Sequence, residues 1–123
     1  MYDKKDLNRI LRRNLRYELD VIKFYLDNLK AFNYSRNKKK IDALVLESVK
    51  HSDMFIKEIL ELNRTTKGKL MKSKVNTAMK EEMGAAEIYS YQINKTRSPK
   101  IKKTLKKIVI DEKKHEKLVN SLK

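Results

Sequence analysis

The stretch Asp111-Glu112-Lys113-Lys114-His115-Glu116-Lys117-Leu118 combines the two features that decide this fold. It lies in a run of apolar residues that recur every three or four positions: Ile101, Leu105, Ile108, Val109, Leu118, Val119 and Leu122. That period is typical of an amphipathic helix. Glu112 and His115 fall on the apolar side of this helix, where charged groups are rare unless they are paired.

The same chemistry occurs 64 residues earlier in the chain, and no gap is needed to align the two halves. Glu18 matches Glu82 and His51 matches His115, so each His follows its matched Glu by 33 residues. Other matched pairs are Leu15 with Met79, Tyr25 with Tyr89, Ile41 with Leu105, Leu44 with Ile108 and Val45 with Val109. The sequence therefore predicts two copies of one helical hairpin, over about 4–63 and about 69–122.

The remaining apolar runs and their breaks predict four helices and no strand. The first helix is expected over about 4–32, followed by a polar turn over 33–37. The second helix is expected to end in the loop 63–68, with Gly68 as its stop signal. A third run extends from 70 to 93, and Ser98-Pro99 is typical of an N-cap followed by a first-turn proline. We predict one all-α domain over residues 1–123, a four-helix bundle built from the two hairpins.

The composition supports this fold class and excludes several kinds of chemistry. The 123 residues include two Gly, one Pro and no Cys. Disulfides, thiolate metal sites and a catalytic thiol are therefore excluded. No apolar run reaches the ~20 residues of a membrane span, and the charged first residues do not resemble a signal peptide. We expect a cytoplasmic protein that does not bind membranes.

Five side chains of metal-ligand type lie on the apolar stripes of the expected helices, at similar heights in the bundle. They are Glu18, His51, Glu82, Glu112 and His115. A buried carboxylate is costly unless it is paired, protonated or bound to a cation. Taken singly, each residue fits a core histidine or a salt-bridged glutamate. Together they predict a site for a borderline cation such as iron, manganese or zinc.

Two tyrosines lie two helical turns from the matched glutamates on the same faces. Tyr25 follows Glu18 and Tyr89 follows Glu82 by seven residues. Each is consistent with a plain core aromatic whose hydroxyl meets solvent. Beside a metal site, however, the hydroxyl groups are placed to hydrogen-bond the ligands.

These motifs resemble the rubrerythrin and ferritin-like superfamily of di-iron carboxylate proteins. Residues 111–118 are similar to the Glu-x-x-His motif of that family's fourth helix, and the Glu–Tyr pairs are similar to its single-Glu motifs. The resemblance implies that the four-helix bundle is ferritin-like and that it binds two metal ions, with iron as the first choice. It also implies that Glu18 and Glu82 are terminal ligands, Glu112 is a bridging carboxylate, and His51 and His115 are the imidazole ligands.

One departure from that family lies in the second helix. Ser48 stands where the resemblance requires a bridging Glu, and Glu47 is one position, about 100°, further round the helix. We therefore expect either that Glu47 swings in to replace the missing carboxylate or that one bridge is absent.

The resemblance also implies a redox function, either oxidation of Fe(II) or reduction of dioxygen or peroxide in oxidative-stress defence. Without cysteine there is no rubredoxin-like centre, so electrons would come from a separate donor protein. The loop between the second and third helices is too short to run the length of a ferritin-like bundle. Three explanations remain open: the helix ends are trimmed, the bundle has a simple up-down topology, or two chains exchange hairpins. We predict a homodimer, and hairpin exchange is one way to form it.

Two alternative functions remain open from the residues alone. The formal net charge is +15, which favours polyanions. Part of this charge lies on the fourth and first expected helices, which carry among others Lys102, Lys103, Lys106, Lys107, Lys113, Lys114, Lys117, Arg12, Arg13 and Arg16. This distribution fits non-specific nucleic-acid binding, although no aromatic residues interleave with the lysines to stack on bases. The other alternative is a metal-free scaffold whose site has decayed at Ser48.

Overall fold

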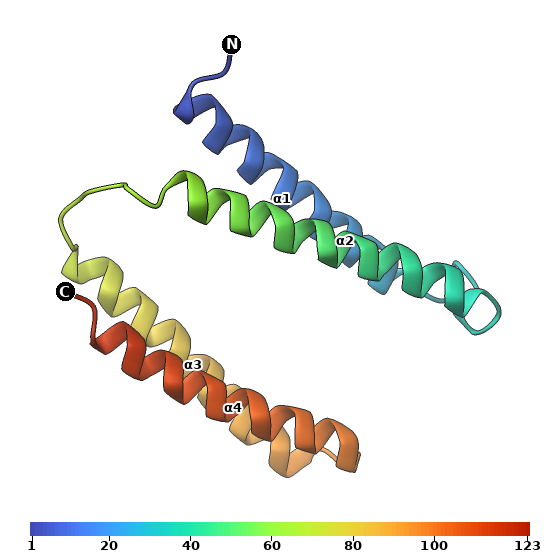
Figure 1. Ribbon diagram of the computed structural model, residues 1–123. Coiled ribbons are helices and arrows are strands. Elements are labelled where there is room, and N and C mark those ends of the chain that lie inside the picture. Colours follow the sequence, from blue (N-terminus) through green and yellow to red (C-terminus); the bar gives the residue numbers. More distant parts are fainter. The chain divides into compact units, whose positions relative to one another are not determined.

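The computed structural model describes all residues from Met1 to Lys123, and it contains four helices and no strand (Figure 1). They are α1 (Lys4–Asp27), α2 (Tyr34–Leu62), α3 (Lys72–Lys95) and α4 (Pro99–Asn120). The all-α prediction is therefore confirmed. The chain divides into two compact units, which we call the N-terminal hairpin (α1 and α2, residues 1–67) and the C-terminal hairpin (α3 and α4, residues 68–123). In each unit the two helices pack side by side.

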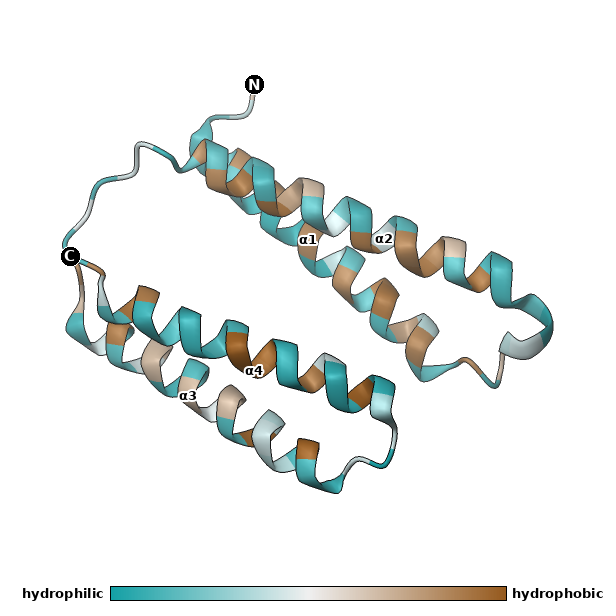
Figure 2. Ribbon diagram, turned by 60° about the horizontal axis from the view of Figure 1, so that its bottom comes forward, coloured by the Kyte–Doolittle hydropathy of each residue, from teal (hydrophilic) through white to brown (hydrophobic).

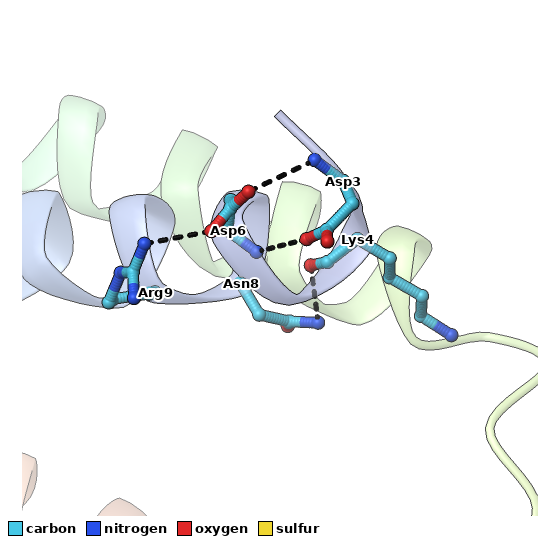
Figure 3. A network of polar contacts seen from close by, with 5 residues as sticks. All are labelled: Asp3, Lys4, Asp6, Asn8 and Arg9. Atoms are coloured by element: carbon cyan, nitrogen blue, oxygen red, sulfur yellow. Dashed lines mark hydrogen bonds and ion pairs between the residues drawn. The ribbon is translucent and has the colours of Figure 1, made fainter. Parts of the chain in front are cut away.

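A capping box fixes the start of α1 (Figure 3). The Asp6 backbone N–H donates to the Asp3 carboxylate at 2.9 Å, and the Asp3 N–H donates to the Asp6 carboxylate at 3.3 Å. This pairing satisfies two backbone donors that the first turn of a helix leaves free. Arg9 forms an ion pair with Asp6 at 2.8 Å, which ties the second turn to the first.

The first helix ends five residues earlier than the sequence predicted, at Asp27 instead of 32. The Asn28 side chain donates to the Phe24 carbonyl at 2.7 Å, and turns then continue to Asn33, whose φ of 48° is left-handed. The apolar period continues past the helix end because the Phe32 ring packs on the Phe24 and Tyr25 rings within the turn. The prediction was wrong because these apolar positions are filled by a compact loop.

The turn also lies earlier than the predicted 33–37, because it occupies residues 28–33 and α2 begins at Tyr34. A non-helical residue at Asn37 (φ −108°, ψ 21°) marks a kink after this first turn. The Tyr34 hydroxyl donates to Asp42 at 2.6 Å, and the Lys38 ammonium also pairs with Asp42. These contacts join the segment before the kink to the helix after it.

The end of α2 does not use Gly68, contrary to the sequence prediction. The helix ends at Leu62, and the Asn63 side chain donates to the Ile59 carbonyl at 2.8 Å. Gly68 lies in the following linker and has no positive φ, so nothing in its backbone requires glycine. An asparagine side chain therefore does what a glycine was predicted to do.

The predicted start of α4 is confirmed in the C-terminal hairpin. The Ser98 hydroxyl accepts from the Ile101 backbone N–H at 3.3 Å, and Pro99 occupies the first turn. The third helix begins at Lys72, two residues after the predicted start at 70. No helix of the chain is both long enough and apolar enough to span a membrane.

Each hairpin buries only the seam between its own two helices. Ile41, Ala86 and Val109 are the only buried apolar residues, and none of them is completely shielded from solvent. Apolar segments also mark all four helices in Figure 2, and many of their large side chains are exposed. Two helices provide half of the core that a helical domain needs.

Candidate metal centre

Three ligand-type side chains converge in the C-terminal hairpin, and we call them the C-terminal half-site. Glu82 comes from α3, whereas Glu112 and His115 come from α4 at a spacing of three residues. One helical turn separates these two residues, so both side chains reach the same side of α4. Glu82 Oε2 lies 3.3 Å and Glu112 Oε2 lies 3.7 Å from the same His115 atom, Nδ1. One potential ligand atom from each residue lies within 4.8 Å of the others.

The two carboxyl groups of this half-site interact directly. A hydrogen bond with Glu82, together with partial burial and the negative charge of Glu82, raises the pKa of Glu112. The carboxylates of Glu82 and Glu112 repel each other when both are ionised, and a divalent cation bound between them would offset that repulsion. The residues present therefore fit a borderline metal ion.

The N-terminal hairpin holds the matched pair, Glu18 of α1 and His51 of α2, which we call the N-terminal half-site. Glu18 Oε1 lies 3.4 Å from His51 Nδ1. Glu47 also contacts His51, but its Oε1 lies 3.4 Å from the other ring nitrogen, Nε2. The structure thus brings Glu47 to the histidine on the side away from Glu18.

Ser48 occupies the position that matches Glu112, one turn before His51. It is buried, with 8% of its surface exposed. Its backbone carbonyl accepts from the Ser52 hydroxyl at 2.9 Å, and its side chain makes no hydrogen bond with Glu18 or His51. No carboxylate enters the N-terminal half-site from this position.

The tyrosines predicted to support the ligands are half-buried within the hairpins. The Tyr25 ring packs against Phe24 and Phe32, with ring centroids 5.7 and 5.3 Å away. Neither the Tyr25 nor the Tyr89 hydroxyl hydrogen-bonds to one of the candidate ligands.

The structure brings together, within each hairpin, the Glu and the His that the 33-residue spacing singled out. The sequence named Glu47 as a residue that could turn towards the site, but it did not predict that Glu47 would contact His51 at Nε2. The spacing of four residues between 47 and 51 was the available signal, because it places both side chains on one helix face. The contacts of Tyr34 and Lys38 with Asp42 were not predicted either, and they do not involve any of the candidate metal ligands.

Comparison with known proteins gives one match. The family model described as Rubrerythrin matches residues 9–123, nearly the whole chain. No curated protein matches the chain. No solved structure matches it either. The family match confirms the resemblance seen in the motifs, and with it the ferritin-like, all-α fold class.

Proposed function

Because the chain belongs to the rubrerythrin family, we propose that it is a metal-binding protein with a dinuclear centre of iron or manganese. The ligands would be Glu18, His51, Glu82, Glu112 and His115. The observation that carries the proposal is the convergence of Glu82 and Glu112 on His115 Nδ1, at 3.3 and 3.7 Å. Family membership supports this function over non-specific nucleic-acid binding.

The reaction that we propose is oxidation of Fe(II) by dioxygen or hydrogen peroxide, as a defence against oxidative stress. With peroxide as the oxidant, two Fe(II) ions become Fe(III), while one hydrogen peroxide and two protons become two water molecules. The bound metal supplies the electron transfer, and the protein supplies the ligands and their placement. The chain contains no cysteine and therefore no rubredoxin-like centre, so the electrons that restore Fe(II) would come from a separate donor protein.

The protein's own contribution to proton balance lies at Glu112. When Glu112 is protonated, its carboxyl group can donate to Glu82, which is the interaction that raises its pKa. A cation bound between these groups would favour the ionised form of Glu112.

The exposed apolar surface supports the pairing of hairpins into complete bundles. In the N-terminal hairpin, Leu19 and Leu26 of α1 and Leu46 and Leu60 of α2 are each at least half exposed. A two-helix layer with such faces is stable only when another layer covers it. We infer that each hairpin is covered by a second hairpin.

The linker between the hairpins favours pairing with a second copy of the chain. Ferritin-like connectivity needs a crossover about as long as α3, whose 24 residues span about 36 Å. Residues 63–66 form a turn, in which the Thr66 N–H donates to the Asn63 carbonyl at 3.0 Å. The five residues 67–71 then reach about 17 Å when extended. A hairpin-swapped homodimer satisfies both constraints.

The proposed reaction is tested by following Fe(II) oxidation at a few equivalents of iron per chain, with dioxygen and with peroxide in turn. The wild type should oxidise Fe(II) faster than the background, and the Glu112→Ala/His115→Ala variant should not. Glu61→Ala, a change on the exposed end of α2, is the matched control and should keep the wild-type rate. Background rates in the wild type would reject the redox function.

A further inference from the structure

The two half-sites share a Glu–His pair but differ in their remaining donors. We propose that the chain holds one metal ion tightly at the C-terminal half-site and a second, exchangeable ion at the N-terminal half-site. This inference rests on the proposed metal-binding function and adds that its two positions are unequal.

The C-terminal half-site presents three donors to one point. Both carboxylates face the same ring nitrogen of His115, so an ion bound there is reached by two negative charges and one imidazole. Glu112 is well shielded, with only 17% of its side chain exposed. A divalent cation that meets two carboxylates at once loses less by leaving water than one that meets a single carboxylate.

The N-terminal half-site cannot present an equivalent set. Glu18 faces Nδ1 of His51, whereas Glu47 faces Nε2. The two ring nitrogens point away from each other, and only one of them carries a free lone pair in the neutral imidazole, so one ion cannot use both ring positions. Within the N-terminal hairpin, an ion at Nδ1 is therefore reached by His51 and Glu18 alone. Glu47 is 59% exposed and competes for the same ring from the solvent side.

Ser48 removes the third donor from the N-terminal half-site. Its hydroxyl is neutral and short, whereas Glu112 places a charged oxygen beside the histidine at the matching position. The loss of one negative charge and one ligand atom predicts a dissociation constant weaker by at least about tenfold, the lower end of what losing only a hydrogen-bond partner of a ligand costs. The weaker position would load and release a divalent ion while the stronger one stays filled.

Calorimetric titration of the full-length protein with Mn(II) tests this proposal. The wild type should show two binding events that differ at least tenfold in dissociation constant. His51→Ala should lose the weak event and keep the strong one, and His115→Ala should lose the strong event. Both histidines are more than 40% exposed, so neither change removes a core residue, and circular dichroism checks that the helices persist.

A reciprocal pair of variants tests the origin of the difference. Glu112→Ser copies the Ser48 arrangement into the C-terminal hairpin, and it should reduce the strong affinity to that of the weak event. Ser48→Glu should bring the weak affinity towards the strong one. Because Ser48 is buried, this change could unfold α2, and Glu112→Ser then decides the result.

The outcomes separate the two proposals. Two equal affinities in the wild type, or loss of the strong event in His51→Ala, would overturn the inequality and leave the metal site standing. No Mn(II) binding at all in the folded wild type would reject the metal-binding function and the inequality with it.

Discussion

Glu112 is the residue of the C-terminal half-site that has no ligand-type counterpart in the N-terminal hairpin. Its carboxyl group lies beside Glu82 and His115, whereas the matched Ser48 is buried and makes no hydrogen bond with Glu18 or His51. Two carboxyl groups at one point destabilise the metal-free protein when both are ionised, and they stabilise it when a cation lies between them. Their effect on stability thus depends on whether the metal is present.

Replacing Glu112 with Gln should separate these two effects. In metal-free protein at neutral pH, Glu112→Gln should raise the melting temperature, because it removes the repulsion by Glu82. With Mn(II) present, the rise in melting temperature seen in the wild type should shrink, and the dissociation constant should weaken by about 10–100-fold. Thermal melts with and without Mn(II) measure both. A variant that keeps the wild-type response to Mn(II) would exclude Glu112 as a ligand.

Asp42 should give the N-terminal hairpin a distinct pH dependence. Hydrogen bonds from Lys38 and Tyr34 lower the pKa of Asp42 below its ordinary value of 3.8 in the folded chain. An acid with a lowered folded pKa stabilises the protein above its unfolded pKa, and this contribution is lost as the pH falls through the folded value. Asp42→Asn should therefore melt below the wild type at pH 7, and the two melting temperatures should converge below about pH 4. A difference that grows on acidification would contradict this assignment.

At the scale of single helices, side-chain caps set most of the boundaries. Ser98 caps α4, the Asp3–Asp6 box caps α1, and Asn28 and Asn63 bond to carbonyls in the last turns of α1 and α2. Such caps satisfy backbone groups that a helix end leaves unpaired. They should therefore contribute measurably to stability despite their exposure.

Loss of the α4 cap should have a cost that a matched change at the other end of the helix does not. Ser98→Ala removes the acceptor for the Ile101 N–H and should lower the free energy of unfolding by about 0.5–2 kcal/mol. Ser121→Ala, at the C-terminal end of α4, is the control and should cost less, since its hydroxyl only donates to the Leu118 carbonyl near a fraying end. Urea unfolding of the three proteins measures the differences. Equal losses would mean that Ser98 does not act as a cap.

The helices were predictable from the sequence, but several of their ends were not. Ser98-Pro99 was predictable because a cap and a first-turn proline are adjacent in the chain. The end of α1 was missed because Phe32 keeps the apolar period while it packs in a loop on Phe24 and Tyr25. Gly68 was overvalued because Asn63, five residues earlier, already closes α2. Periodicity reports which residues are covered, whereas the end of a helix depends on local hydrogen bonds.

The predicted site shows the same division between spacing and orientation. The 33-residue spacing found Glu18 with His51 and Glu82 with His115, because two helices of a hairpin meet at a fixed register. The spacing did not show which ring nitrogen each carboxylate faces, and this is what separates Glu47 from Glu112. That choice depends on side-chain rotation about the helix.

At the scale of the whole molecule, each hairpin provides only half of the core of a four-helix bundle. Only three apolar residues are buried, and Leu46 and Leu60 of α2 are about two-thirds exposed. The family match establishes a ferritin-like chain, and the short linker favours completion of its bundles by a second copy. The association of two chains would then be necessary for stability as well as for the metal centre.

Linker length should control the number of chains. Light scattering should give the mass of two 14.7-kDa chains, about 29 kDa, for the wild type. Ten Gly/Ser residues inserted between Lys67 and Gly68 would extend the five-residue reach to about 50 Å, enough for one chain to close its own bundle. This variant should be a monomer. A monomeric wild type, or an insertion that leaves the mass of the assembly at two chains, would reject the hairpin exchange.

Glu82, Glu112 and His115 are proposed to hold a metal ion, and the metal content of the purified protein is the measurement to make. The protein would be purified without a chelator or a His tag, beside the Glu112→Ala/His115→Ala variant, and analysed for iron, manganese and zinc. We expect up to two equivalents of iron or manganese per chain, of which at least one survives dialysis and is lost in the variant. Metal-free protein that stays empty after reconstitution with Fe(II) and Mn(II) would contradict the claim.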